Sequence, residues 1–281
     1  MPFVTTKEMF EKSMKEKFAI GAFNINNMEF VQAIMDAAAK ENSPVILQTS
    51  ASAIKDARIP YLKKMIEAGL EEHDIPVALH LDHGPDFETC KMCVDNGYTS
   101  IMFDGSKYDF ETNIKLTKEV VDYAHAHGVV VEAELGKLAG IEDDVNVSAE
   151  DAMYTDPEEA KEFVERTGCD SLAVAVGNVH GVYSAEPKIR FDIIEAVNKE
   201  VSVPLVLHGA SGIGDEDIKK AIQCGIAKIN IHTELCQAAM EAINEHKDEP
   251  FLAVERAVRQ AVKERAMYKI KLFGDDGRAD E

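Results

Sequence analysis

The chain has 281 residues and a formal net charge of −21 at pH 7. This length can bury a large core, and an α/β barrel of this size forms one domain. The negative charge disfavours broad contacts with nucleic acid or with an anionic membrane surface, because both would repel most of the molecule.

The sequence shows no N-terminal basic and apolar signal, and no apolar run near the roughly 18 residues of a spanning helix. We therefore expect a soluble, cytoplasmic protein. Its five cysteines are odd in number and scattered, unlike the framework of a secreted disulfide-rich protein. We expect reduced thiols.

Short apolar or β-branched runs alternate with amphipathic helical stretches along the whole chain, as in βα units with a parallel sheet. The expected strands cover 18–23, 44–48, 76–81, 99–103, 129–135, 171–176, 204–207 and 226–231. Eight such units predict an α/β fold, a (β/α)8 TIM barrel, in a single domain over 1–281.

Two segments lie outside this alternation. Residues 136–156 are rich in glycine and acidic residues, and we expect a long loop there with a role in the active site. Residues 250–272 have an apolar face at helical spacing and stop before Gly274, which predicts a C-terminal helix packed on the barrel or on a subunit neighbour.

Polar residues end all eight expected strands, so one rim of the barrel collects them. They are Asn24, Ser50, Asp82, His83, Asp104, Glu132, Glu134, His180, His208, Asn230 and Thr233. Active sites of TIM barrels form at the rim where the strands end. The pattern therefore predicts an enzyme site at that rim.

Three of these residues are histidines, and each comes directly before a glycine: His83 in HLDHG, His180 in AVGNVHG and His208 in LVLHGASG. Three neutral imidazoles leave a coordination position open, which is typical of a catalytic zinc site rather than a structural one. The alternative is that each histidine bonds only to local backbone. Asp82 is next to His83, where it can be a ligand, orient a histidine or transfer a proton, and spacing does not choose among these roles.

The segments HGASG (208–212) and INIHTE (229–234) predict an anion-binding site. Their glycines expose backbone N–H groups, and Ser211 and Thr233 add hydroxyl groups near helix starts. By contrast, His80 and the CKMC segment (90–93) are interpreted as structural, in the barrel interior and in a helix respectively.

The motifs GAFN, HLDHG, EAELG, GNVHGVY, LHGASG, KINIHTE and LFGDDGRA together resemble class II, zinc-dependent ketose-bisphosphate aldolases. The resemblance covers nearly the whole chain. It implies cleavage of fructose 1,6-bisphosphate, tagatose 1,6-bisphosphate or another ketose phosphate to dihydroxyacetone phosphate and an aldehyde. It also implies a homodimer or homotetramer.

The resemblance implies a role for each matching residue. His83, His180 and His208 match the zinc ligands, Asp82 matches the acid/base at the C4 hydroxyl, and Glu142 matches the glutamate that exchanges a proton at the nucleophilic carbon. Zinc then stabilises the enediolate formed when C3–C4 breaks.

Further matches concern substrate and cations. Asn24 resembles a substrate-orienting asparagine, with Ser50 as a further rim candidate, while Asp104 and Glu134 resemble carboxylates around the metal or an alternate metal position. The matching residues of the C1-phosphate site are Gly181, Gly209, Ser211, Asn230 and Thr233. A monovalent cation, Na⁺ or K⁺, usually lies beside these phosphate loops.

The chain departs from the family pattern where the far end of the substrate binds. His232 stands where fructose-bisphosphate enzymes have aspartate, and Cys236 stands where many members have a basic residue. Phe251 replaces a common arginine. Tagatose-bisphosphate enzymes usually have a small residue at the position of His232, so neither pattern fits. The cations that could still hold a distal phosphate are Arg256, Arg259 and Lys55, although each is at least as consistent with an exposed helix or loop residue. The differences suggest a ketose 1-phosphate whose distal group is not a simple phosphate.

Two other chemistries remain as alternatives. A Schiff-base aldolase would need a lysine at the carbonyl, and Lys228 is the nearest candidate, although its place inside a strand suggests a structural role. A zinc-dependent barrel hydrolase would commonly begin with an HxH pair on the first strand, where this chain has GAFN.

Overall fold

The structure is a computed structural model that describes residues 3–142, 145–147, 153–181 and 187–279. For residues 139–142, 145–147 and 180 it describes only the backbone. Among the described residues, no helix combines the length and the apolar character needed to cross a membrane.

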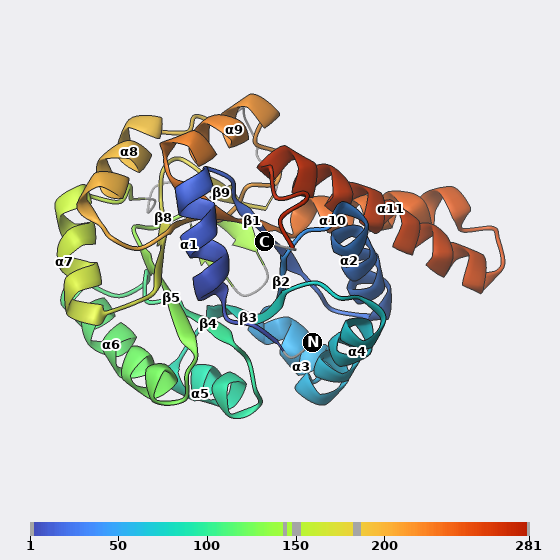
Figure 1. Cartoon of the computed structure of the whole chain (residues 1–281), viewed down its shortest axis with the longest axis horizontal. Coiled ribbons are helices and arrows are strands. Elements are labelled where there is room, and N and C mark those ends of the chain that lie inside the picture. Colours follow the sequence, from blue (N-terminus) through green and yellow to red (C-terminus); the bar gives the residue numbers. More distant parts are fainter. Residues whose placement is uncertain (1–2, 143–144, 148–152, 182–186, 280–281) are drawn as a thin grey trace.

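Eight parallel strands form a closed barrel in the order β1, β11, β10, β8, β5, β4, β3, β2 (Figure 1). Their bounds are β1 Ile20–Asn24, β2 Val45–Thr49, β3 Val77–Gly84, β4 Ser100–Phe103, β5 Val130–Leu135, β8 Ser171–Val174, β10 Leu205–Leu207 and β11 Ile226–Ile231. They match the eight expected strands. The (β/α)8 TIM barrel is therefore confirmed.

Helices surround this barrel (Figure 1). They are α2 Met28–Glu41, α3 Ala51–Ala57, α4 Ile59–Glu72, α5 Phe87–Asp95, α6 Phe110–Ala126, α7 Pro157–Thr167, α8 Phe191–Glu200, α9 Asp215–Cys224 and α10 Thr233–His246. Several begin at a side chain that accepts a hydrogen bond from a free N–H of the first turn, such as Asp86 at α5 and Asp156 at α7. Cys90 and Cys93 of the CKMC segment are buried in α5.

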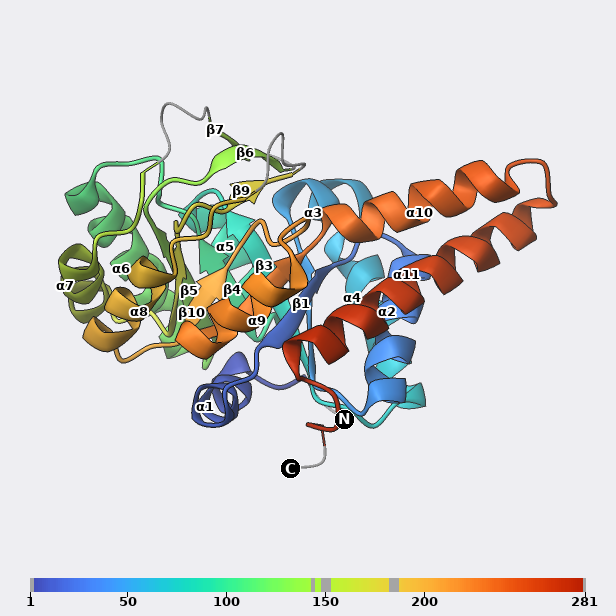
Figure 2. The ribbon, with the colours of Figure 1, turned by 90° about the horizontal axis from the view of Figure 1, so that it is seen from above.

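Helix α1 (Thr6–Glu16) crosses the end of the barrel where the strands begin, and both chain ends lie on that side (Figure 2). Its Met9 and Phe10 pack against Ile20 and Ala227 of the strands. The Ser13 hydroxyl donates to the carbonyl of Ala227 at 3.2 Å. This end is closed by apolar packing, so a substrate must enter at the other end.

A short second sheet lies beyond that other end (Figure 2). Strands β6 (Ala139–Glu142) and β7 (Val145–Val147) pair antiparallel, and β6 also pairs parallel with β9 (Val179–His180). The segment 136–156, where the sequence predicts a long active-site loop, thus contains two short strands among its described residues. Short apolar alternation in AGIE and VNV lets the segment pair with itself and with β9.

The last helix, α11 (Phe251–Phe273), spans the range where the sequence predicts a C-terminal helix. It forms a hairpin with α10, packs along α2, and extends beyond the ring of helices (Figures 1 and 2). Phe251 and Leu252 at the tip are 74% and 65% exposed.

The barrel interior contains an ion pair. Lys228 Nζ lies 2.7 Å from Glu132 Oε2, and both side chains are at most 1% exposed. Burial alone would raise the pKa of Glu132, but the charge of Lys228 and a hydrogen bond from His208 hold it well below its usual range. His80 bonds to Ser100 at 2.7 Å, and burial together with Lys228 lowers its pKa to about 3. His80 is thus a neutral interior residue.

The C-terminal segment is fastened to the first strand. Gly274 ends α11 with φ of 70°, a left-handed conformation that favours glycine. The following Asp275 is fully buried and accepts a hydrogen bond from the Gly21 N–H at 3.1 Å. Burial raises the pKa of its carboxyl to about 8 despite that bond.

Replacing Lys228 with methionine should destabilise the fold by about 3–5 kcal/mol, because Glu132 would remain buried without its ion-pair partner. Adding Glu132→Gln to Lys228→Met should recover most of the loss. Denaturant unfolding of the three proteins measures both effects. If Lys228→Met were as stable as the wild type, the Lys228–Glu132 ion pair would not contribute to the stability of the fold.

Asp275 predicts a specific pH dependence. Its stabilising contribution is complete below the unfolded pKa near 3.8 and is lost as pH rises towards the folded pKa near 8. We expect the wild type to lose ~2 kcal/mol more unfolding free energy between pH 6 and pH 8 than Asp275→Asn, a neutral isostere. Unfolding curves at the two pH values test this, and parallel losses would contradict it.

Candidate active site

A β-bulge at the end of β3 directs two neighbouring side chains to one place. Leu81 pairs with Ile101 and Gly84 with Phe103, so β3 has one residue more than β4 between these pairs. His83 has φ of 47°, which is strained for a non-glycine residue. Neighbours on a regular strand point to opposite faces, but this bulge brings Asp82 and His83 together.

Gly84 completes the bulge. A Cβ added there would lie 2.4 Å from the carbonyl oxygen of Met102 and 2.8 Å from Cys90 Sγ. No other residue can occupy this position without moving backbone, so the glycine of HLDHG is a packing requirement of the bulge.

The rings of His83 and His208 meet nearly at right angles at the rim, with an interplanar angle of 83° and with His83 Nε2 2.9 Å from His208 Nδ1. The outer nitrogen of each ring faces a carboxylate: His83 Nδ1 lies 3.0 Å from Asp104 Oδ2, and His208 Nε2 lies 2.8 Å from Glu132 Oε1. When the nitrogens that face the carboxylates carry the protons, the other two nitrogens, His83 Nε2 and His208 Nδ1, both direct a lone pair into the space between the rings.

Two facing lone pairs need a proton or a cation between them. Burial lowers the pKa of His208. Burial acts the same way on His83, but its hydrogen bond to Asp104 and nearby acidic charges outweigh it and raise the pKa well above its usual range. The two nitrogens therefore form a position that suits a positive charge, either a shared proton or a metal ion.

The donor set fits a divalent cation. Ligand atoms of Asp82, His83 and His208 all lie within 4.8 Å of one another, as do those of His83, Asp104 and Glu134. Among the described residues, Glu134 Oε2 is buried without a hydrogen-bond partner. Burial and the neighbouring Asp104 raise the pKa of this carboxyl well above its usual value. The surplus of buried acid suits a positive ion.

Amide groups hold the Asp82 carboxylate in place. Its oxygens accept hydrogen bonds from Asn24 at 2.8 Å, Gln48 at 3.1 Å and Asn230 at 3.1 Å. Sequence reasoning missed Gln48, although its position as the polar residue of the apolar strand PVILQ is a usable signal. The amides limit the orientations open to the carboxylate.

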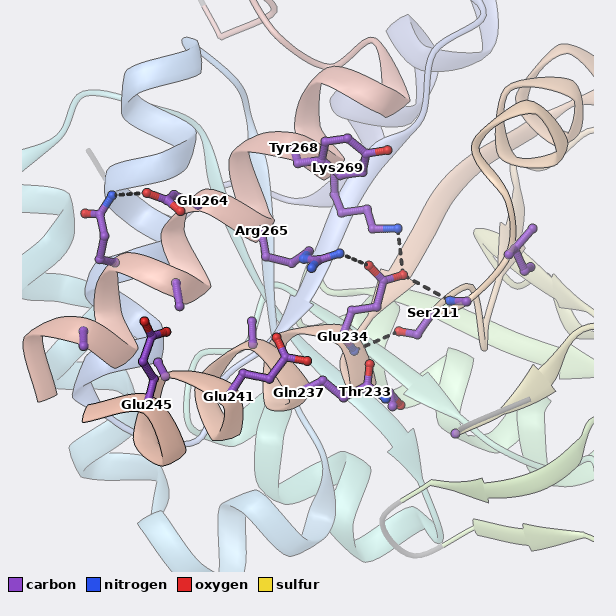
Figure 3. Close-up of a pocket in the computed structure, with 18 of the residues that line it drawn as sticks. Ser211, Thr233, Glu234, Gln237, Glu241, Glu245, Glu264, Arg265, Tyr268 and Lys269 are labelled. Atoms are coloured by element: carbon purple, nitrogen blue, oxygen red, sulfur yellow. Dashed lines mark hydrogen bonds and ion pairs between the residues drawn. The ribbon is translucent and has the colours of Figure 1, made fainter. Parts of the chain in front are cut away.

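The predicted phosphate residues divide between two places. Gly181, Ser211 and Thr233 line one cleft of about 1330 Å³ beside α10 and α11 (Figure 3). Asn230 is buried next to Asp82. Gly209 has φ of 58° in the loop after β10.

A second, smaller cleft contains His232, one of the two residues expected at the far end of the substrate, and we call it the distal cleft. It is lined by Asn24, Ile25, Asn26, Ser50, Ser52, Ala53, Asp56 and His232. Among these described lining residues there is one acid and neither lysine nor arginine. Cys236 instead packs against the hydrophobic core.

Two predicted residues have side chains outside the described part of the chain, His180 and Glu142. Their backbones belong to the second sheet, where Gly140 pairs with His180 and Glu142 follows on the same strand. The sheet therefore brings the segment of the third histidine beside the segment of the glutamate.

Comparison with known proteins agrees with this geometry. The sequence model of the family described as fructose-bisphosphate aldolase class-II matches residues 4–278. The YdjI protein of Escherichia coli K12 is 52% identical over 263 residues, 94% of each chain. A fructose-bisphosphate aldolase of Staphylococcus epidermidis is 46% identical over 288 aligned residues, 99% of this chain and 100% of that protein.

A solved structure resembles the whole chain. The crystal structure described as that of the YdjI aldolase from Escherichia coli K12 superposes with a TM-score of 0.91 and 48% identity over 100% of both chains. The family model and the relatives span almost the full length. The chain therefore belongs to the class II fructose-bisphosphate aldolase family and is an aldolase, a carbon–carbon lyase.

Proposed function

We propose that this protein reversibly cleaves a ketose 1-phosphate to dihydroxyacetone phosphate and an aldehyde, with a zinc ion held by His83, His180 and His208. The observation that carries the proposal is the pair of facing imidazole nitrogens 2.9 Å apart, each ring oriented by a carboxylate, with Asp82 beside them. A bound zinc ion would act as a Lewis acid towards the substrate carbonyl.

Asp82 is the proposed base for cleavage. It takes the proton from the C4 hydroxyl, the C3–C4 bond breaks, and C4 leaves as the aldehyde while the electron pair stays with the dihydroxyacetone half. Glu142 then returns a proton to C3. The three amides that bond to Asp82 fix the orientation of its carboxylate. One of them, Asn24, is proposed to orient the substrate as well.

The C1 phosphate is proposed to bind where the strand-end loops meet α10. Gly181, Gly209 and Ser211 belong to these loops, and Thr233 begins the helix. Backbone N–H groups and hydroxyls at a helix start suit a phosphate dianion. Asn230 would link this site to Asp82, because its amide already bonds to that carboxylate.

The distal cleft favours a substrate other than a bisphosphate. A second phosphate needs cations, but the described lining has Asp56 and His232 and no lysine or arginine. We therefore propose, as the narrower candidate, a ketose 1-phosphate whose distal group is not a phosphate. Fructose 1,6-bisphosphate and tagatose 1,6-bisphosphate are the alternatives that this cleft disfavours.

A homodimer or homotetramer, a monovalent cation near the phosphate loops and a place in cytoplasmic carbohydrate metabolism such as glycolysis remain predictions from the family resemblance. The exposed Phe251 and Leu252 of the hairpin tip support self-association, since large exposed apolar side chains often mark interfaces.

Removing the metal or the base should stop the reaction in different ways. Chelation should abolish cleavage of ketose 1-phosphates, and added zinc should restore it. Asp82→Asn should lower kcat by about 10²–10⁴-fold while the variant still binds zinc, because it loses only proton transfer. A coupled assay for dihydroxyacetone phosphate and metal analysis measure both effects. Lack of product from every ketose phosphate offered would refute the proposed reaction.

The distal cleft predicts substrate preference. Ketose 1-phosphates with a neutral distal end should have a higher kcat/KM than fructose 1,6-bisphosphate, and Asp56→Asn should narrow that difference by removing a repelling charge. Side-by-side steady-state kinetics provide the test. Efficient cleavage of the bisphosphate by the wild type would rule out the narrower candidate.

A further inference from the structure

The predicted phosphate loop is tied to the helix that follows the last barrel strand. Ser211 Oγ accepts a hydrogen bond from the Glu234 backbone N–H at 3.3 Å, and Glu234 Oε1 accepts one from the Gly212 N–H at 3.1 Å (Figure 3). These two reciprocal bonds join loop 208–212 to the first turn of α10. The side chain of Glu234 thereby holds the backbone of the loop.

The C-terminal helix supplies the charges around this carboxylate (Figure 3). Lys269 Nζ lies 2.7 Å from Glu234 Oε1, and Arg265 Nη1 lies 3.2 Å from Glu234 Oε2. The Lys269 side chain is 3% exposed and that of Glu234 is 11% exposed. A charged lysine buried this deeply needs an ionised partner, so the Lys269–Glu234 ion pair is a fixed structural feature of the cleft.

The same helix also fixes the element after the loop. Tyr268, next to Lys269, bonds through its hydroxyl to Asp215, the first residue of α9. Helix α11 therefore contacts both the loop 208–212, through Glu234, and the start of the helix that follows it. Residues far apart in the sequence together determine the position of the loop.

Charge decides what this arrangement does for an anion. A carboxylate beside a phosphate site would repel a phosphate dianion, and the whole chain carries −21. Glu234, Lys269 and Arg265 together have a net charge of +1, and all three line the cleft that contains Ser211 and Thr233. Four further acidic residues line the same cleft, namely Asp215, Glu241, Glu245 and Glu264. Glu234 is the acid that bonds to the loop itself, and the two cations offset its charge there.

We propose that Glu234 and Lys269 are positioning residues for phosphate binding: Glu234 holds loop 208–212 through Gly212, and Lys269, assisted by Arg265, neutralises Glu234. This inference rests on the proposed function, because it takes the cleft beside Ser211 and Thr233 as the site of the C1 phosphate. It assigns α11 to substrate binding rather than only to packing.

The experiment compares metal-loaded wild type, Lys269→Met, Lys269→Arg and the double variant Glu234→Gln/Lys269→Met. Lys263→Met is the matched control, because Lys263 is on the same helix and pairs with Asp36 at 3.0 Å, away from the cleft. Two readouts are used: the Kd for inorganic phosphate by calorimetry, and KM and kcat for the ketose 1-phosphate that is cleaved best.

Lys269→Met should raise the phosphate Kd and the KM by about tenfold or more and change kcat less than twofold, because it removes one of the two positive charges beside Glu234 and leaves only Arg265 to offset that carboxylate. Lys269→Arg keeps the positive charge and should retain most of the phosphate affinity that Lys269→Met loses, and the control Lys263→Met should behave like the wild type. The double variant should recover most of the affinity, because Glu234→Gln removes the repelling charge and keeps an oxygen for Gly212. If Lys269→Met does not fold, the double variant is compared with the wild type directly: a similar phosphate Kd supports the inference, and a Kd raised about tenfold overturns it.

Three results would overturn the inference: unchanged phosphate Kd in Lys269→Met, a double variant that binds phosphate as weakly as Lys269→Met, or equal losses in Lys263→Met. If Lys269 only stabilised the packing of α11, the double variant would not recover phosphate binding, or Lys263→Met would lose it equally. Failure of the proposed function gives another pattern, in which no ketose phosphate is cleaved although phosphate binds to the wild type and more weakly to Lys269→Met. That pattern would support the anion site and refute the reaction.

Discussion

The Glu132 carboxylate joins the core of the barrel to its rim. One of its oxygens faces Lys228 in the interior, and the other faces His208 at the site. A buried carboxylate remains ionised only when its charge is compensated, so Lys228 allows Glu132 to orient the imidazole. The position of His208, and of the nitrogen that faces His83, therefore depends on an ion pair deep in the barrel. A change in the core at Lys228 would therefore also alter the site at His208.

Acidic groups create the main electrostatic problem of the rim. Asp82, Asp104 and Glu134 collect around the two histidines, which favours a cation there. The same acidic chain must also bind a phosphate if it works on sugar phosphates. Amide N–H groups and hydroxyls at helix starts contribute without added charge, and α11 brings Lys269 and Arg265 to the adjoining carboxylate. The two cations of α11 thus offset the carboxylate that bonds to loop 208–212, whereas the acids around the histidines favour a positive ion.

Local patterns predicted the eight strands well, because each is a short apolar run between helices with clear polar faces. The rim position of Asp82, His83 and His208 followed from the same pattern. Gln48 and Glu234 were missed because their roles depend on partners in other elements: Gln48 reaches Asp82 from a neighbouring strand, and Glu234 reaches Lys269 from α10. The pairing of β6 with β9 was missed for the same reason, since it joins two segments about forty residues apart.

The sequence by itself determined the barrel and the residues at its rim, because strand periodicity and glycine turns are local properties, and from those residue types it predicted metal and phosphate binding. The departures at His232 and Cys236 were also visible there. Only the tertiary structure decided which groups meet: the bulge that brings Asp82 beside His83, the carboxylate behind each imidazole, and the lysine of α11 that pairs with Glu234 beside loop 208–212. These contacts join residues distant in the chain, and closure of the barrel and docking of the last helix set their distances.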